Sequence, residues 1–214
     1  MEEQARSKLL PGVVRLREQR EALTRQTILN AARALFAERG YAATPIRELA
    51  RRAGVAPQTI YATYGSKAGV LAGLPDLIDQ EAGVLELFEA RLDTTDPVEL
   101  VGLLSRIARR IRERCGDVLK MWRSGAAVEP DIAATQREGH RRRRLGVLAI
   151  LERVHAQGAL ADHLTLTRAA DLAVALMTDD VCDALVDEAG WSYDEYEAWL
   201  AATLAAQLLR RPAD

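Results

Sequence analysis

Cysteine, histidine and aromatic residues are all scarce in this chain of 214 residues. It contains 2 cysteines and 3 histidines, and Phe, Trp and Tyr together make up 5% of the sequence. Cys115 and Cys182 stand far apart, with no Cys-x-x-Cys pair and no histidine cluster nearby. Neither a disulfide framework nor a metal site is therefore expected, and two isolated thiols fit a reducing cytoplasm as the location.

Long apolar runs and catalytic motifs are also missing. No stretch of about 18 apolar residues occurs, and the first ten residues, MEEQARSKLL, lack the apolar core of a signal peptide. There is no Gly-rich phosphate loop, no Gly-x-Ser-x-Gly and no His-Glu-x-x-His. One Glu-x-x-His occurs, at Glu152 and His155, but a di-iron helical site needs a second copy. We therefore expect no enzyme activity and no cofactor.

Signals for β-strands are few, whereas Ala, Leu and Arg, which favour helices, dominate. Apolar spacing, caps and Gly or Pro breakers predict an all-α fold of about nine helices. The expected ranges are 22–39, 45–52, 57–63, a helix from 66 that Pro75 interrupts, 97–114, 117–126, 129–157, 168–189 and 193–209. Thr44, Asp96, Thr167 and Ser192 are the expected N-caps, Ser192 in a capping box with Glu195, whereas Ala56 leaves its helix without one.

Charge is distributed unevenly, although the net charge is only −2. Residues 1–72 contain 12 Lys and Arg against 6 Asp and Glu, and residues 73–214 contain 17 against 25. Such an asymmetry favours a nucleic-acid-binding front on an acidic body, although charge also fluctuates along ordinary chains.

Residues 44–71, TPIRELARRAGVAPQTIYATYGSKAGVL, contain two short helices joined by a Gly turn. Such a pair is typical of a helix-turn-helix, whose second helix enters the major groove, although helix pairs are common in any helical protein. Ile60 and Tyr64 are four residues apart and should pack inward. Side chains suited to base edges are Gln58, Thr59, Ala62 and Thr63, and those suited to phosphates are Thr44, Arg47, Tyr61, Tyr64 and Lys67.

The same segment resembles the TetR family of bacterial transcriptional repressors. The resemblance rests on Thr44, Leu49-Ala50, Ala53-Gly54-Val55, Tyr61, Tyr64, Ser66-Lys67 and Leu71, and on Ile28, Ala31-Ala32, Leu35-Phe36, Gly40 and Tyr41 in the preceding helix. It covers about residues 22–72. Leu49 stands for the usual Ile and Tyr64 for the commoner Phe, Gln58 replaces a small residue, and Pro75 is unusual in the helix that links head to body.

The resemblance implies three regions: a flexible basic arm over 1–20, a DNA-binding head over 21–66 and a ligand-binding and dimerisation body over 67–214. It implies a homodimer that binds a palindromic operator in double-stranded DNA and is released by a small-molecule effector. Arg20 and Arg25 would add phosphate or minor-groove contacts. The expected dimer contacts are Leu185, Tyr196, Trp199, Leu200, Thr203, Leu204 and Gln207, although these positions also suit an intramolecular core.

Residues that combine polarity or flat rings with apolar surroundings are candidates for the effector site: Cys115, Met121, Trp122, His140, Met177, Thr178 and Asp180. Each also has an ordinary explanation, since Met and Trp at helical spacing are usually core and Asp179-Asp180 fits a solvated face. The run Arg141–Arg144 is interpreted as a helix surface paired with acids such as Glu138. An activator, an all-α ligand-binding or scaffolding protein without DNA activity, and a helical enzyme remain as alternatives.

Overall fold

The computed structural model describes residues 2–90 and 93–210, with the side chains of the first helix described from Arg15 onward. The chain forms two compact units, Met1–Leu77 and Ile78–Asp214. The described ranges are helical and contain no strand, only an isolated bridge between Leu160 and Leu209. The prediction of an all-α fold is confirmed.

The first unit is built on four helices: α1 (Glu2–Arg39), α2 (Ile46–Ala53), α3 (Pro57–Tyr64) and α4 (Lys67–Ala72). The expected apolar faces form its core, with these side chains buried: Ile28, Leu35, Phe36, Leu49, Ala50, Ile60, Val70 and Leu71. The Phe36 and Tyr41 rings pack edge to face, with centroids 5.3 Å apart. This core holds α2 and α3 in a fixed relation to the second half of α1.

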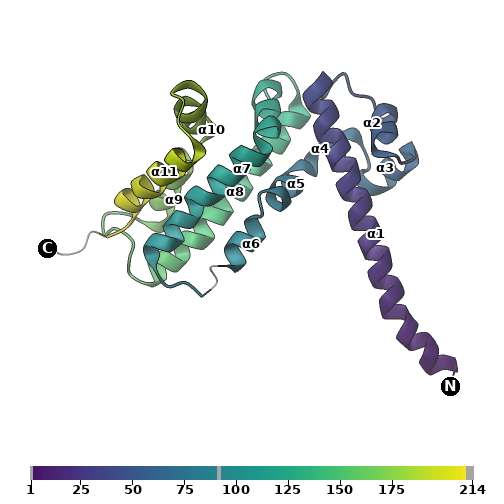
Figure 1. Cartoon of the computed structure of the whole chain (residues 1–214), viewed down its shortest axis with the longest axis horizontal. Helices are drawn as coiled ribbons and strands as arrows, with labels where there is room; N and C mark the ends of the chain where they lie inside the picture. The colour runs from purple at the N-terminus through teal and green to yellow at the C-terminus, as the bar shows by residue number, and fades with distance from the viewer. Residues whose placement is uncertain (1, 91–92, 211–214) are drawn as a thin grey trace. The chain divides into compact units, whose positions relative to one another are not determined.

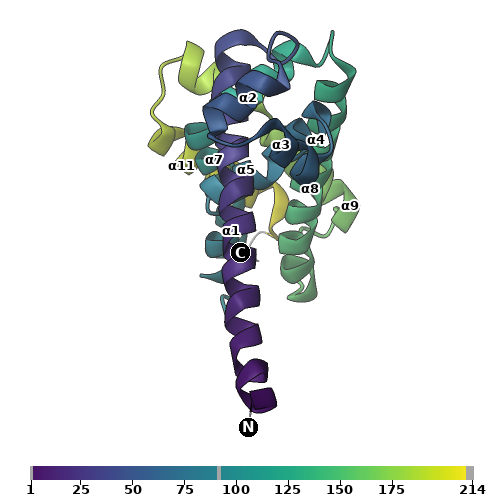
Figure 2. The ribbon, with the colours of Figure 1, turned by 90° about the vertical axis from the view of Figure 1, so that its right-hand side faces the viewer.

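Helix α1 begins twenty residues earlier than the expected start at residue 22. Its first half extends beyond α2, α3 and α4, as both views of the ribbon show (Figure 1, Figure 2). Residues 15–23 are all exposed, and Arg17 forms an ion pair with Glu21, 2.9 Å away on the next turn. Side-chain pairs four residues apart support such an exposed helix.

The helix expected from residue 66 is divided into α4, α5 (Leu74–Glu81) and α6 (Val84–Glu89). The first break falls at Gly73, so Pro75 lies in the first turn of α5, where a missing N–H breaks no helical hydrogen bond. A side chain at Gly73 would lie 2.9 Å from Leu29 and 3.0 Å from the Tyr64 ring. Close packing at Gly73, rather than Pro75, marks the end of α4.

The second unit contains α7 (Pro97–Gly125), α8 (Pro130–Ala156), α9 (Leu166–Leu176), α10 (Asp179–Cys182), the π-helical segment η1 (Asp183–Glu188) and α11 (Tyr193–Leu208). Helix α7 packs against α8 and α11, and α9 packs against α8 (Figure 1). Their shared core includes Leu100, Leu104, Ile150, Leu151, Val154, Ala169, Ala173, Tyr196, Leu200 and Leu204.

Three boundaries in this unit differ from the sequence-based prediction. The expected helices 97–114 and 117–126 are joined in α7, with one non-helical residue, Cys115 (φ −129°, ψ 17°), at the kink. The expected helix 168–189 is divided into α9, α10 and η1, and Thr165 rather than Thr167 caps α9. The expected capping box at Ser192 and Glu195 is present, and Asp96 caps α7 by accepting a hydrogen bond from the Val98 N–H.

No helix in the described part of the chain is both long enough and apolar enough to cross a membrane.

Candidate nucleic-acid interface

Helices α2 and α3 are joined by a tight turn at Gly54, which has the left-handed φ of +66°. The Val55 N–H donates to the Ala50 carbonyl at 3.0 Å and closes the end of α2. Ile60, on the inner face of α3, is fully buried, so the residues on the opposite face of α3 are turned outward. The pair therefore has the helix-turn-helix geometry that the sequence predicts.

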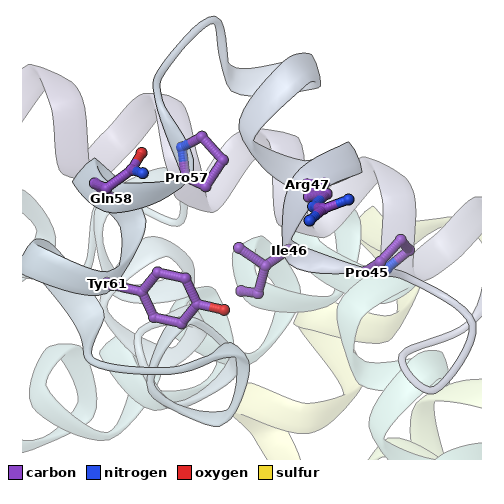
Figure 3. A pocket seen from close by; sticks show the side chains of 6 residues that line it. All are labelled: Pro45, Ile46, Arg47, Pro57, Gln58 and Tyr61. Carbon is purple, nitrogen blue, oxygen red and sulfur yellow. The ribbon is translucent and has the colours of Figure 1, made fainter.

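A surface hollow of ≈ 480 Å³ lies between the first turns of α2 and α3 (Figure 3). Pro45, Ile46 and Pro57 give it apolar walls, and the remaining lining residues, Arg47, Gln58 and Tyr61, are polar. The Tyr61 ring extends across the hollow, with its hydroxyl toward Ile46. Neither helix has a side-chain cap, since Pro45 and Ala56 occupy the N-cap positions. The absent cap at Ala56 agrees with the sequence-based prediction.

Arg47 differs from the other arginines of α2. Arg51 lies 3.6 Å from Glu48 and Arg52 lies 3.0 Å from Glu38, whereas Arg47 is exposed and has no ion-pair partner among the described residues. An unpaired guanidinium beside an open hollow can bind a phosphate without first giving up an internal partner. The structure thus leaves Arg47 available for the role that the sequence suggests.

The expected base-reading residues lie on the outer side and flanks of α3. Gln58, Tyr61 and Ala62 are exposed, with Tyr61 at 52%, whereas Thr59 and Thr63 are half-buried. The Thr63 hydroxyl donates to the Thr59 carbonyl at 2.7 Å, so it retains only acceptor capacity. The structure brings these residues together on one surface.

The polar groups of Tyr64 and Lys67 form hydrogen bonds within the first unit. The Tyr64 hydroxyl donates to the Arg25 carbonyl at 3.2 Å, which uses the proton that a phosphate contact needs. The Lys67 ammonium donates to the carbonyls of Tyr41 and Ala42, at 2.9 and 3.3 Å, and lies 4.3 Å from the Tyr41 ring centroid. Both residues support the head, and only Lys67 retains an N–H for a phosphate.

Thr44 corrects two expectations. It is completely buried rather than exposed, and Pro45 takes the N-cap position in its place. Its hydroxyl donates to the Gly40 carbonyl at 2.8 Å, just beyond the end of α1. Because the tertiary contact with α1 uses the hydroxyl, Thr44 secures the turn before α2 and does not reach a phosphate.

The arginines expected at the start of the head lie on the exposed side of α1. Arg20 and Arg25 are both exposed, and the Arg25 guanidinium lies 5.8 Å from the centroid of the Tyr64 ring. Burial raises the pKa of Tyr64 above its ordinary value, and the positive charge of Arg25 opposes that shift. Arg25 is therefore tied to the end of α3.

Sequence reasoning did not identify the apolar walls of the hollow or the need for glycine after α3. The sequence does place Pro45 and Pro57 at two neighbouring helix starts, and this is the signal from which the walls could have been inferred. Gly69 gives no signal of its own, yet a side chain there would lie 1.9 Å from the Tyr64 carbonyl oxygen. Its N–H donates to the Ser66 hydroxyl at 3.0 Å, and this hydrogen bond caps α4, the helix that follows α3 in the sequence.

The seven candidate effector residues are not gathered at one place. Met177 lies in the core of the second unit, and the Thr178 hydroxyl donates to the Ala175 carbonyl. The Asp180 side chain is 86% exposed and pairs with Arg123, which fits the alternative of a solvated face. The other members vary in exposure: Cys115 and Trp122 are buried, Met121 is half-buried and His140 is exposed.

Trp122 and His140 have distinctive surroundings. The Trp122 indole N–H has no hydrogen-bond partner among the described residues, and its ring packs 3.2 Å from the position that a side chain at Gly139 would take. The pKa of His140 is lowered, first by burial and then by the charge of Arg143. In the described ranges, no group of three or more His, Cys, Asp or Glu side chains is placed to hold a metal ion.

Three of the seven expected dimer contacts belong to the chain's own core. Tyr196, Leu200 and Leu204 are buried at 1%, 0% and 0% exposure within a single chain. A second copy cannot reach them, so the alternative of an intramolecular core is correct for these positions. Leu185, Trp199 and Thr203 are half-buried and Gln207 is exposed.

The run Arg141–Arg144 is fully engaged with acids, as the sequence-based interpretation holds. Arg141 and Arg142 pair with Glu138, at 2.7 and 3.1 Å, and Arg142 also lies 3.5 Å from Asp79. Hydrogen bonds from Arg141 and then Arg142 lower the pKa of Glu138 to about 2. The last two pairs are Arg143 with Asp179, at 3.4 Å, and Arg144 with Asp171, at 2.5 Å.

Comparison with known proteins agrees with this geometry. Residues 28–74 match the model of the family described as bacterial regulatory proteins, tetR family. A TetR-family transcriptional regulator from Syntrophomonas wolfei has a TM-score of 0.71 at 18% identity, over 86% of this chain and 93% of that one. The regulator FadR from Bacillus subtilis, in complex with stearoyl-CoA, has a TM-score of 0.68 at 16% identity, over 85% and 97%.

A third similar structure is a transcriptional regulator from Saccharomonospora viridis in complex with choline, with a TM-score of 0.63 at 20% identity, over 87% of this chain and 98% of that one. The comparison with curated proteins gives no match. Residues 28–74 thus match the tetR family of bacterial regulatory proteins, and the chain shares its fold with these solved regulators.

Proposed function

We propose that this protein is a DNA-binding transcriptional regulator that acts on DNA in the cytoplasm, as a repressor released from a palindromic operator by a small molecule. The observation that carries the proposal is the surface around the hollow. There Arg47 on α2 and Gln58 and Tyr61 on α3 are exposed. None of the three has a side-chain partner among the described residues. These groups suit phosphates and base edges.

Operator binding by this surface calls for two copies of the chain. Helix α3 has 8 residues and offers few contacts, so a two-fold pair of heads in successive major grooves binds far more tightly. The outward sides of α9 and α11 are suited to the contact between copies. Leu172 is 40% exposed on α9, and α11 has the small residues Ala202 and Ala206 and the amide of Gln207 exposed. We propose that these faces form the dimer.

The effector is proposed to bind in the second unit. Similar structures with bound choline and stearoyl-CoA support the idea that this fold can accommodate a small molecule. To release the operator, the effector must bind more tightly to a dimer conformation in which the spacing of the two heads does not match the operator. Such a coupling is typically about 1–3 kcal/mol between the two sites.

Binding to random duplex DNA at low and high salt tests the proposal. The basic head should bind at low salt and lose affinity steeply as salt rises, because phosphate contacts release counterions. Arg47→Gln should weaken binding to all sequences alike and reduce the salt slope by about 1. The matched control is Arg141→Gln, which removes a surface arginine of the second unit and should leave binding unchanged.

The outcome separates the classes of protein that the sequence leaves open. A dimer that binds no duplex even at low salt would overturn the proposal and favour an all-α ligand-binding or scaffolding protein, or a helical enzyme. A chain that remains monomeric and binds DNA as a single head would overturn the palindromic operator but not the DNA-binding role.

A further inference from the structure

The outward groups of α3 differ in the hydrogen bonds that they can offer. Ala62 has no polar group, and the Thr63 hydroxyl already donates its proton to the Thr59 carbonyl. Thr59 is half-buried and has a single hydroxyl, which suits any base. The Tyr61 hydroxyl is directed across the hollow toward Ile46. None of these side chains can offer a free donor and an acceptor side by side.

Gln58 can offer both. Its side chain is exposed in the first turn of α3, at the edge of the hollow, and its amide has no partner among the described residues (Figure 3). The N-terminal residues of a recognition helix are those that reach base edges in the major groove. An amide there supplies an oxygen that accepts and a nitrogen that donates, separated by one carbon.

We propose that Gln58 reads an adenine in each half of the operator, an inference that rests on the proposed DNA-binding function. Adenine presents an N6 donor and an N7 acceptor at the major-groove edge, which match the amide oxygen and nitrogen. Guanine presents two acceptors, O6 and N7, so the amide oxygen would face O6 without a proton between them. The two-fold symmetry of the dimer places the second adenine at the mirrored position.

Selection from a pool of randomised duplexes tests this assignment without a known operator. The pool is bound to the wild-type protein, to Gln58→Ala and to the control Gln80→Ala, which removes an exposed amide on α5. The wild type and Gln80→Ala should retain duplexes with an adenine at one mirrored position. Gln58→Ala should retain duplexes that have lost this preference while the other positions persist.

A chemical change in the DNA then isolates the contact. Replacing the selected adenine by 7-deazaadenine removes the N7 acceptor and keeps the base pair. Replacing the A·T pair by G·C should weaken the wild type roughly 5- to 150-fold, the range for a bidentate contact, and 7-deazaadenine should account for part of that loss. Gln58→Ala should bind adenine and 7-deazaadenine equally.

The results distinguish failure of the proposed DNA-binding function from failure of the assignment of Gln58. If the wild type retains no duplex from the pool, the proposed DNA-binding function fails. If the wild type selects a clear sequence that Gln58→Ala selects unchanged, or if 7-deazaadenine weakens both proteins equally, DNA binding stands and the assignment of Gln58 is wrong.

Discussion

The Tyr64 hydroxyl donates a hydrogen bond to the backbone carbonyl of Arg25, 39 residues earlier, at 3.2 Å. The Arg25 guanidinium lies 5.8 Å from the centroid of the same ring. Tyr64 is the last residue of α3, so this double contact fixes the end of the recognition helix against α1. The position of the proposed base-reading surface therefore depends on this contact between α3 and α1.

Removing the Tyr64 hydroxyl should lower stability without removing the ring. We expect Tyr64→Phe to reduce the free energy of unfolding by about 1 kcal/mol, the usual net value of such a hydrogen bond. Urea denaturation measures the change. Tyr61→Phe is the matched control, because its exposed hydroxyl has no partner among the described residues and its loss should leave stability unchanged. Equal losses in the two variants would contradict the role assigned to Tyr64.

Alkaline pH should weaken the same contact. Burial raises the pKa of Tyr64 in the folded state above 10, so the fold favours the protonated phenol. The stabilising contribution is present below pH 10 and is lost as the pH rises through the folded pKa, because only the unfolded chain then ionises readily. As the pH rises past the ordinary tyrosine pKa of about 10, the stability difference between wild type and Tyr64→Phe should shrink, as measured by urea midpoints. A constant difference would contradict this.

Gly69 should tolerate no larger residue. A methyl group there would lie 1.9 Å from the Tyr64 carbonyl oxygen, so the backbone must move. We expect Gly69→Ala to cost about 3 kcal/mol and to lower DNA affinity, as measured by thermal unfolding and a binding assay. Gly146→Ala is the control, because a side chain at Gly146 in α8 meets nothing within 4 Å and should stabilise by about 0.5–1 kcal/mol. A tolerated Gly69→Ala would contradict the packing argument.

Arg112 should matter more than the exposed arginines. It is 5% exposed and pairs with Asp183 and, at 3.2 Å, with Asp187, which joins α7 to η1. Replacing it by Leu removes a buried cation that pairs with the half-buried Asp183, and we expect a loss of about 2 kcal/mol in urea denaturation. Arg141→Leu, which breaks an exposed pair, should cost much less than Arg112→Leu. Similar losses for the two variants would show that burial of Arg112 has little energetic effect.

The sequence predicts local features well where neighbouring residues alone decide them. The capping box at Ser192 and Glu195 is such a case, because both hydrogen bonds lie within one helical turn. Thr44 is the opposite case. Thr before Pro is a good local cap, yet packing against the end of α1 buries the side chain and moves the cap to Pro45. Tertiary burial cannot be read from a local pattern.

The apolar stripe of the last helix shows a second limit. Spacing by four residues predicts that Tyr196, Leu200 and Leu204 share one face, and they do. The pattern predicts that this face is buried, but it does not predict whether α7 or a second copy of the chain buries it. Likewise, the sequence predicts that α3 presents Gln58 and Tyr61, whereas the hollow between α2 and α3 depends on how two separate helix starts meet.

The run Arg141–Arg144 has a consequence for the kinetics of folding. Consecutive residues point around α8, and Arg143 and Arg144 meet acids on α10 and α9 that lie 36 and 27 residues away. Those ion pairs can close only once the helices have docked, so we expect them to form late in folding. Contacts of this kind slow unfolding far more than they speed folding. Arg143 and Arg144 should therefore slow the opening of the second unit.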